Sequence, residues 1–414
     1  MSRLVVLGAG TAGTMVANKL SRRLGADWDI VVIDKKTEHH YQPGYLFVPF
    51  SIYDSDELIK PTERFLPDGV QFINAEIDRV EADESKVLLA DGREIEYDQL
   101  VIATGTTPRP DETEGMLGPN WRKTVHEFYT LDGAEALEKA LGAWSGGNLV
   151  VHLTELPIKC PVAPIEFAFL VDHHLRERGL RENTQLTYVT PLPDAFTKPV
   201  ASKLLGSMFE ERNIALETDF VIERVDDAAI VSYDEREIPF DLLVTVPVNM
   251  GADFVGRSGL GDELNHVPVD PYTFISSKYD NVFAIGDAAN LPTSKAGSVA
   301  HFAVEVFVEN FLQHIRGEEM TEQFDGHANC FIETGGGKAL LIDFDYETEP
   351  LPGLYPLEHV GPMSLLKESR INHFGKMAFR SIYWNALIKG RPIPLPHHRT
   401  GHQPEEAEPE EVMS

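Results

Sequence analysis

Residues 4 to 13 read Leu4-Val5-Val6-Leu7-Gly8-Ala9-Gly10-Thr11-Ala12-Gly13, an apolar run that leads into a G-x-G-x-x-G turn. The run predicts a buried strand, residues 14–24 have the pattern of a helix, and residues 30–33 predict the next strand. Glycines at such a turn let backbone amides approach a pyrophosphate at the start of the helix. Asp34 ends the second strand, where an acid binds a ribose hydroxyl and disfavours a 2′-phosphate. We therefore expect a dinucleotide to contact Gly8, Gly10, Thr11, Ala12, Gly13, Asp34 and Lys35.

The chain beyond this unit continues in the same alternation of strands and helices. A second α/β unit is predicted from residue 148, with helices near 166–178 and 201–212, and a strand at 281–285 precedes a long helix that ends near residue 315. We predict an α/β fold with two Rossmann-like dinucleotide-binding units, the first interrupted by the second, plus a C-terminal membrane-docking region. The expected boundaries are 1–112 and 263–322 for the first unit, 113–262 for the second, 323–404 for the C-terminal region and 405–414 for an acidic disordered tail.

Composition excludes several classes of protein. With 414 residues, 43% of them hydrophobic and 25% charged, the chain is typical of a soluble globular protein of more than one domain. Its net charge of −30 argues against a nucleic-acid partner. We find no membrane-spanning apolar run and no signal peptide, and therefore expect a cytoplasmic location. Two cysteines, Cys160 and Cys330, are too few for a disulfide-stapled scaffold or a four-cysteine metal site, and no metal site is predicted.

The turn of the second unit differs from that of the first. Its sequence is His152-Leu153-Thr154-Glu155-Leu156-Pro157-Ile158-Lys159-Cys160-Pro161-Val162-Ala163-Pro164, with three prolines and no glycine. Proline supplies no backbone N–H and cannot adopt a positive φ, so this turn offers no cradle for phosphate. A nicotinamide donor is therefore disfavoured, and Cys160 stands near the place where that donor would react. The neighbouring Lys159 would favour a thiolate.

The C-terminal region has the opposite charge to the rest of the chain. Residues 363–399 contain seven lysines and arginines against Glu368 alone, and apolar residues such as Phe374 and Trp384 are interleaved with them. This pattern is typical of a helix that lies at a membrane surface. We expect peripheral attachment at the cytoplasmic face of the membrane, with a domain or dimer interface as the alternative. A homo-oligomer is left open.

Two further segments resemble signatures of the two-dinucleotide-binding-domain flavoproteins: Val101-Ile102-Ala103-Thr104-Gly105 and Val282-Phe283-Ala284-Ile285-Gly286-Asp287. The resemblance implies that the cofactor is FAD and that Asp287 lies beside its ribityl chain. The remaining expected cofactor contacts are Pro43, Ile77, Ala103, Thr104, Gly105, Gly286, Asp287 and Lys295.

A narrower resemblance covers nearly the whole chain. Pro157-Ile158-Lys159-Cys160 with Ala163-Pro164, residues 285–295, and His40-Tyr41-Gln42-Pro43-Gly44 resemble the sulfide:quinone oxidoreductases. This implies that Cys160 and Cys330 are a catalytic redox pair; we favour Cys330 as the flavin partner and Cys160 as the sulfide acceptor, although the sequence does not fix that order. Some members have a third cysteine upstream, and residues 126–130 have none, which favours a two-cysteine mechanism.

The activity implied by this resemblance is oxidation of hydrogen sulfide to sulfane sulfur or polysulfide, with electrons passed through FAD to a quinone. Phe331, Phe379 and Tyr383 are expected quinone contacts, because aromatic side chains near the second cysteine and in the basic segment can stack on a planar ring. Two alternatives remain: a type II NADH:quinone oxidoreductase on the same fold, and a flavin-containing sulfur-carrier or redox-sensing protein. The missing second glycine motif and the cysteine pair count against the first.

Overall fold

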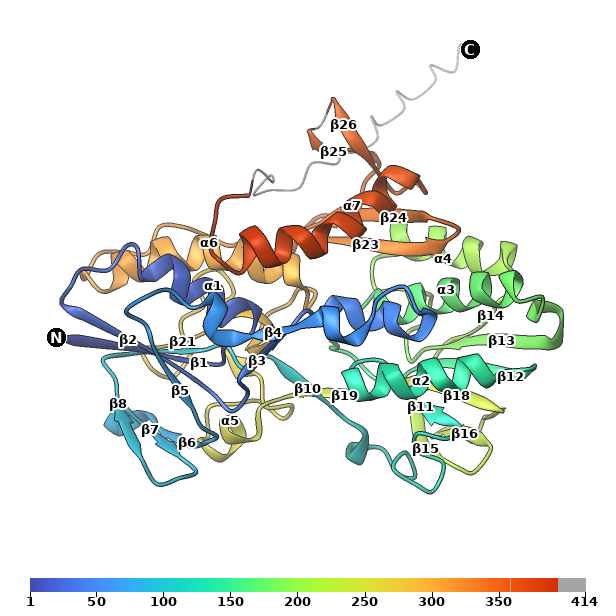
Figure 1. Ribbon diagram of the computed structural model, residues 1–414, viewed down its shortest axis with the longest axis horizontal. Coiled ribbons are helices and arrows are strands. Elements are labelled where there is room, and N and C mark those ends of the chain that lie inside the picture. Colours follow the sequence, from blue (N-terminus) through green and yellow to red (C-terminus); the bar gives the residue numbers. More distant parts are fainter. Residues whose placement is uncertain (358, 394–414) are drawn as a thin grey trace, which may run out of the picture.

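The computed structural model describes residues 1–357 and 359–393, which form two lobes with a C-terminal layer across them (Figure 1). The first lobe is built on a sheet of five parallel strands in the order β21-β9-β1-β2-β5. These strands are β1 (Ser2–Leu7), β2 (Trp28–Asp34), β5 (Gln71–Asn74), β9 (Gln99–Ile102) and β21 (Val282–Ala284). Because β21 follows the second lobe in the chain, the predicted interruption of the first unit by the second is confirmed.

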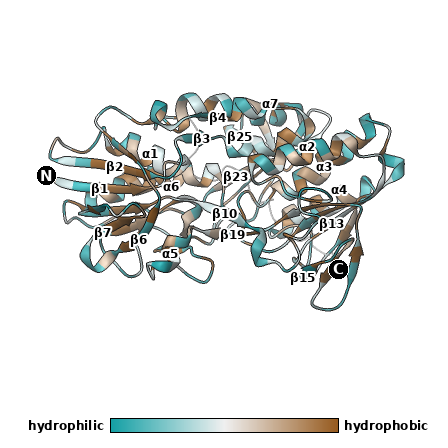
Figure 2. Cartoon of the chain, turned by 60° about the horizontal axis from the view of Figure 1, so that its bottom comes forward, coloured by the Kyte–Doolittle hydropathy of each residue, from teal (hydrophilic) through white to brown (hydrophobic). Residues whose placement is uncertain are grey.

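Alternating side chains on β1 pack in two directions. Leu4 and Val6 join the core beneath helices α1 (Thr11–Leu20) and α6 (Gly297–His314), whereas Val5 and Leu7 join a second core toward the antiparallel sheet β6-β7-β8. Figure 2 shows these strands as hydrophobic segments inside the lobe. Helix α1 begins at Thr11, three residues before the predicted start, because the third glycine of the motif lies inside the helix and not in the turn.

The second lobe has the same plan. Its parallel sheet has the order β11-β18-β12-β13-β14 and packs against three helices. The elements are β11 (Val125–His126), β12 (Gly147–Leu153), β13 (Thr184–Val189), β14 (Ala215–Glu217), β18 (Leu242–Val246), α2 (Leu131–Ala143), α3 (Ala163–Glu177) and α4 (Pro199–Glu211). Strands β10 (Thr106–Arg109) and β19 (Val248–Gly251) pair where the chain passes between the lobes. The predicted α/β fold with two Rossmann-like units is confirmed, whereas the membrane-docking role of the C-terminal region and the domain boundaries stay predictions.

Shorter elements edge the two lobes. They are β3 (Glu38–His40), β4 (Ile59–Pro61), β6 (Ile77–Glu81), β7 (Lys86–Leu89), β8 (Glu94–Glu96), β15 (Ile222–Val225), β16 (Ala229–Ser232), β17 (Glu237–Pro239), α5 (Asp253–Arg257), β20 (Val267–Pro268) and β22 (Ala289–Asn290). A 3₁₀ helix, Gln42–Phe50, contacts both α2 and α3, and thus joins the first lobe to the second.

The C-terminal layer contains more structure than the sequence pattern predicted. Two antiparallel hairpins, β23 (Ala328–Gly335) with β24 (Lys338–Phe344) and β25 (Gly353–Leu357) with β26 (Gly361–Leu365), precede helix α7 (Arg370–Ile382) and a π-helical turn, Tyr383–Leu387. No helix in the described ranges has the length and apolar character needed to cross a bilayer. The predicted tail 405–414 and residues 394–404 lie outside the described residues.

Candidate active site

The glycine turn after β1 has the shape that a pyrophosphate requires. Gly8 has a φ of +99°, and a Cβ added there would lie 2.5 Å from the carbonyl oxygen of Ala103. A Cβ at Gly13 would overlap the carbonyl oxygen of Gly8, whereas a Cβ at Gly10 would meet nothing within 4 Å. Gly8 and Gly13 are therefore required by the protein's own packing. Gly10 instead leaves open space at the start of α1, where a phosphate can approach the backbone amides.

Asp34 supports this turn from the end of β2. One of its carboxylate oxygens accepts a hydrogen bond from the backbone N–H of Ala9 at 2.7 Å, and the other accepts one from Lys36 at 2.9 Å. The side chain of Lys35 is exposed, with its Nζ 3.9 Å from a carboxylate oxygen of Glu76. Asp34 thus stands at the edge of the cradle, and its contact with a ribose stays a prediction.

The other two signatures reach the same edge of the first sheet. Ala103, Thr104 and Gly105 follow β9, which pairs with β1, while Gly286 and Asp287 follow β21, which pairs with β9. A Cβ at Gly286 would lie 3.0 Å from the Cβ of Ala12, so the third signature contacts the first. The hydroxyl of Thr104 is buried without a hydrogen-bond partner in the described part of the chain.

Asp287 and Lys295 are ionisable residues of opposite charge beside this edge of the first sheet. The Lys295 ammonium is 7% exposed and donates hydrogen bonds to the backbone carbonyls of Asp287 (2.8 Å) and Ala289 (3.0 Å). Burial lowers the pKa of Lys295, and burial raises the pKa of Asp287 against the opposing charges of Lys295 and Lys159. The open glycine turn, the unpartnered Thr104 hydroxyl and this pair fit the phosphates and polar groups of FAD.

Two expected cofactor contacts lie apart from these groups. Pro43 is exposed at the start of the 3₁₀ helix Gln42–Phe50. The side chain of Ile77 is packed in the core between the first sheet and β6-β7-β8. Their contacts with the cofactor stay predictions.

Cys160 lies in the proline-rich turn between β12 and α3, in an unusual backbone conformation. Its φ is +48°, a value that residues other than glycine rarely adopt. The backbone is held on both sides: its N–H donates to the carbonyl of Lys295 at 2.6 Å, and its carbonyl accepts from Ala163 N–H (2.9 Å) and the Tyr129 hydroxyl (3.2 Å). The bond to Lys295 ties the cysteine turn of the second lobe to the cofactor edge of the first.

Cys330 reaches the same place from β23. The backbone N–H of Glu333, three residues further along this strand, donates to a carboxylate oxygen of Glu166 on α3 at 2.8 Å. The Cys330 residue is 6% exposed, and its pKa is raised first by burial and then by the charge of Cys160. Helix α3, which follows Cys160, packs against β23, which carries Cys330. The fold therefore places the two cysteines in one region, although 169 residues lie between them in the sequence; both are free thiols.

A buried ion pair beside the thiols was not foreseen from the sequence. Lys376 on α7 pairs with Glu166, whose side chain is fully buried, and also donates to the carbonyl of Phe331 at 3.2 Å. Burial opposes the charge on Lys376, but Glu166, Cys160 and Glu333 outweigh it and raise the pKa of Lys376. Burial raises the pKa of Glu166, and its second carboxylate oxygen has no hydrogen-bond partner among the described residues.

The expectation that Lys159 makes Cys160 a thiolate is corrected by this geometry. The ammonium of Lys159 points to Gln42, to which it donates at 2.9 Å, and burial lowers its pKa to about 8. Burial raises the pKa of Cys160 to about 12, and the cation that counteracts this rise is Lys376. The sequence signal that pointed to Lys376 was its place in the basic C-terminal segment, and the sequence pattern assigned that segment to the membrane surface.

The three predicted quinone contacts have different surroundings. The Phe331 side chain packs with Leu341 and Met363 beside Cys330 on β23. The ring centroid of Phe379 lies 6.4 Å from those of Tyr41 and Tyr383. Tyr383 is 2% exposed, with its hydroxyl bonded to Thr11 and His39. Their roles toward quinone stay predictions.

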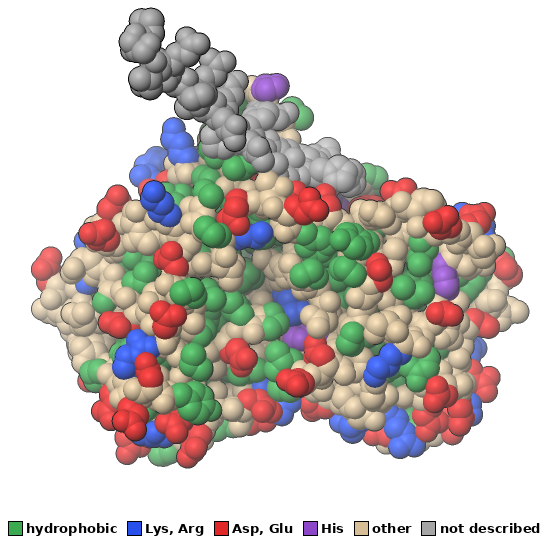
Figure 3. Space-filling model, turned by 180° about the vertical axis from the view of Figure 1, so that it is seen from behind, with side chains coloured by type: hydrophobic (Ala, Val, Ile, Leu, Met, Phe, Trp, Pro, Cys, Tyr) green, Lys and Arg blue, Asp and Glu red, His purple; other side chains and the backbone are tan. Residues whose placement is uncertain are grey.

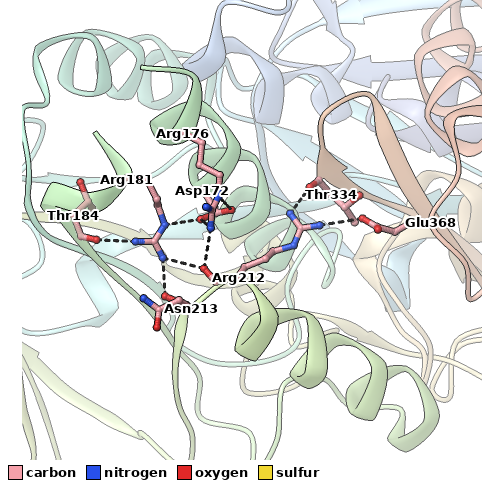
Figure 4. Close-up of polar contacts among 8 residues, drawn as sticks. All are labelled: Asp172, Arg176, Arg181, Thr184, Arg212, Asn213, Thr334 and Glu368. Atoms are coloured by element: carbon pink, nitrogen blue, oxygen red, sulfur yellow. Dashed lines mark hydrogen bonds and ion pairs between the residues drawn. The ribbon is translucent and has the colours of Figure 1, made fainter. Parts of the chain in front are cut away.

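An arginine network keeps the C-terminal hairpin against the second lobe (Figure 4). Arg212, directly after α4, donates to the carbonyl of Thr334 at 2.6 Å and pairs with Glu368 at 3.0 Å. The carbonyl of Arg212 accepts in turn from Arg176 and Arg181, which both pair with the buried carboxylate of Asp172 on α3. The strand that carries Cys330 is therefore fixed relative to the helix that follows Cys160.

Comparison with known proteins agrees with this site. Residues 2–153 match the family model described as pyridine nucleotide-disulphide oxidoreductase. The mitochondrial sulfide:quinone oxidoreductases of Dictyostelium discoideum and Mus musculus are 28% and 26% identical to this chain over 94% of its length, and the alignments cover 87% and 86% of those proteins. The crystal structure of the sulfide:quinone oxidoreductase from Aquifex aeolicus superposes with a TM-score of 0.79 at 21% identity, over 94% of this chain and 92% of that one.

The chain is thus similar along nearly its full length to sulfide:quinone oxidoreductases, and it shares the fold of one of them.

Proposed function

We propose that the protein oxidises hydrogen sulfide to sulfane sulfur or polysulfide and passes the electrons through FAD to a quinone. One observation carries the proposal: Cys160 is hydrogen-bonded to the backbone of Lys295 at the cofactor edge of the first lobe, and the strand that carries Cys330 packs against the helix that follows Cys160. A glycine turn for nicotinamide phosphates is absent from the β12–α3 connection, and a cysteine turn takes its place. Two cysteines that can form a disulfide beside a flavin site provide a route for the two-electron oxidation of sulfide.

The cysteines carry the sulfur chemistry in their disulfide form. Hydrosulfide attacks the bond between Cys160 and Cys330; that bond breaks, the incoming sulfur bonds to Cys160 as a persulfide, and Cys330 leaves as a thiolate. Removal of two electrons releases sulfane sulfur and restores the disulfide. The overall balance is HS⁻, one proton and quinone to sulfane sulfur and quinol.

Lys376 assists because the chemistry forms a thiolate in a buried site. Burial disfavours that charge and raises the pKa of both thiols. The Lys376 ammonium lowers both pKa values and stabilises whichever cysteine leaves as thiolate. Glu166 holds the ammonium in place from the start of α3.

FAD bound in this cradle would supply a two-electron acceptor between the cysteines and the quinone. The glycine turn at Gly8 to Gly13 would hold its pyrophosphate, Asp34 its ribose, and Asp287 with Lys295 the polar groups near the cysteine turn. Phe331 and Phe379 are proposed to contact the quinone, as is the ring of Tyr383, whose hydroxyl is already bonded.

We propose membrane docking through one side of α7. The exposed residues Ile371, Phe374, Ala378 and Ile382 recur every three or four positions and form an apolar stripe, and Phe374 is 67% exposed. Exposed Lys367 precedes this helix, exposed Arg370 is its first residue, and exposed Arg391 follows it. Figure 3 shows acidic side chains spread over one face of the molecule. Apolar insertion combined with attraction to anionic lipid is the usual basis of peripheral binding, here at the cytoplasmic face.

A vesicle assay tests the docking stripe. Phe374→Glu should reduce co-sedimentation of the holoprotein with anionic vesicles by at least fivefold, because it places a charge in the centre of the stripe. Leu117→Glu is the matched control, since Leu117 is 51% exposed on the second lobe. Equal binding of both variants would contradict docking through α7.

Stopped-flow spectroscopy of the anaerobic holoprotein tests the activity. Sulfide should bleach the flavin absorbance, a soluble quinone should restore it, and Cys160→Ser or Cys330→Ser should abolish the bleaching. NADH serves as the second reductant in parallel runs.

The two alternative functions predict different changes of the flavin absorbance in these stopped-flow runs. Bleaching by NADH that both cysteine variants retain would establish a type II NADH:quinone oxidoreductase and overturn the proposal. Bleaching by sulfide that no quinone reverses would favour a sulfur-carrier or redox-sensing protein.

A further inference from the structure

The hydroxyl of Tyr383 lies against the glycine turn, in a buried chain of hydrogen bonds. It is 2.8 Å from the hydroxyl of Thr11, the first residue of α1, and 2.6 Å from Nε2 of His39. Nδ1 of His39 lies 3.0 Å from the carbonyl oxygen of Ala9. The series of hydrogen bonds therefore joins Thr11 to Ala9, the residues on either side of Gly10.

The carbonyl of Ala9 can only accept a hydrogen bond, and this fixes which group donates at each step of the series of contacts. Burial lowers the pKa of His39 to about 4, so its ring is neutral near pH 7 and carries one N–H. The carbonyl of Ala9 accepts, so Nδ1 of His39 is the donor and its Nε2 accepts from Tyr383. The Tyr383 hydroxyl donates its single proton to His39, so the Thr11 hydroxyl must donate to Tyr383.

This direction has a consequence for phosphate binding at the turn. The Thr11 hydroxyl has a single proton, which points to Tyr383 and is not available to an anion. The backbone N–H groups after Gly10 remain as the donors. Their positions depend on Ala9, Gly10 and Thr11, of which Gly10 is free of any side-chain restraint.

The residues that follow Tyr383 are hydrogen-bonded to the last part of α1 and to Arg22 just after it. Asn18 donates to the carbonyl of Ile388 at 3.1 Å, and Arg22 donates to those of Lys389 (2.7 Å) and Gly390 (2.9 Å). Tyr383 is thus the first of several contacts by which residues 383–390 hold the first helix of the FAD-binding lobe.

We propose that Tyr383 is a positioning residue for the FAD pyrophosphate, and that the C-terminal segment 383–390 is part of the flavin site. The hydroxyl holds the glycine turn in its binding shape before the cofactor arrives, which reduces the conformational entropy lost on binding. The inference rests on FAD binding and not on the proposed oxidation of sulfide.

Titration of the FAD-stripped full-length protein tests this role through flavin fluorescence. Tyr383→Phe should raise the dissociation constant of FAD roughly fivefold to tenfold, as expected for one hydrogen bond. Thr11→Val should do the same, Thr11→Ser should restore binding, and Thr11→Val with Tyr383→Phe should be no weaker than either alone. Tyr53→Phe is the matched control, because its hydroxyl contacts Met377 on α7 without reaching the turn.

Several outcomes would overturn the inference. An unchanged FAD dissociation constant in Tyr383→Phe, with only a raised KM for quinone, would make Tyr383 a quinone contact. An equal weakening in Tyr53→Phe would assign the effect to general packing of α7. If Tyr383→Phe fails to fold, the two Thr11 variants decide the matter, and equal FAD affinity in Val and Ser would refute the proposal.

Discussion

Replacement of Lys376 by methionine tests whether the ion pair with Glu166 is a working part of the site. Methionine keeps much of the volume of the lysine stem and removes the charge. The Glu166 side chain is fully buried and that of Lys376 is 13% exposed, so the variant leaves a buried carboxylate without its cation. Breaking a buried pair in this way costs about 3–5 kcal/mol of unfolding free energy.

The same change acts on the thiols. The Lys376 charge lowers the pKa of Cys160, which burial already raises to about 12, so its loss should raise that pKa further. We expect Lys376→Met to slow bleaching of the flavin by sulfide and to reduce the unfolding free energy in urea. Glu166→Gln combined with Lys376→Met should recover most of the stability, because no unpaired charge stays buried, but not the rate.

Lys338→Met is the matched control, since Lys338 is exposed on β24 and should change stability by less than about 0.5 kcal/mol. A loss below about 1 kcal/mol in Lys376→Met would refute the argument from burial. A double variant as unstable as the single one would show that the unpaired carboxylate is not the cause. Unchanged sulfide kinetics would remove Lys376 from the proposed chemistry.

Two further predictions concern the glycine turn and His39. Gly13→Ala should lower both apoprotein stability and FAD affinity, because the new Cβ overlaps the Gly8 carbonyl, whereas Gly10→Ala should lower FAD affinity alone. Thermal melting of the apoprotein and titration with FAD distinguish the two variants. Equal losses of melting temperature in both would contradict the different roles assigned to Gly10 and Gly13. Because the pKa of His39 is lowered from 6.5 to about 4, the unfolded state binds more protons than the folded state between these pH values. The free energy of unfolding should therefore decrease as the pH is lowered from about 6.5 to about 4, and His39 should account for up to ~3 kcal/mol of that loss. His39→Gln should flatten this part of a urea-midpoint profile, and an unchanged slope would sink the assignment.

Local sequence signals identified the fold because the groups that define it are adjacent in the chain. The glycine motif, the strand before it and Asp34 lie within about 30 residues, and each has a physical requirement that shows in residue type. The same holds for the proline-rich turn, whose lack of glycine excluded a second phosphate cradle. The pairing of Cys160 with Cys330 came from family resemblance and not from spacing.

Contacts between distant segments could not be predicted in this way. Lys376 and Glu166 are 210 residues apart, and Tyr383 and Thr11 are 372 apart. In the sequence, Lys376 was one basic residue among seven in a segment assigned to the membrane, while Lys159 stood next to the cysteine. Proximity along the chain favoured the wrong lysine, because side chains that follow one another in a turn need not point the same way. Helical spacing was the available signal, since Lys376 does not fall on the stripe of Ile371, Phe374, Ala378 and Ile382.

Helix α7 and the turn after it therefore connect three parts of the proposed mechanism. The buried side supplies Lys376 to the cysteines, Tyr383 at its end holds the glycine turn, and the exposed stripe is proposed to meet lipid. Docking can alter the buried sites only if lipid binds one position of the helix better than another. In that case anionic vesicles should tighten FAD binding to the apoprotein, and FAD should tighten vesicle binding by the same factor, because linkage between two sites is reciprocal. Unequal factors would show that the two measurements do not report one equilibrium, and a factor of one in both would mean that α7 anchors the protein without changing its flavin site.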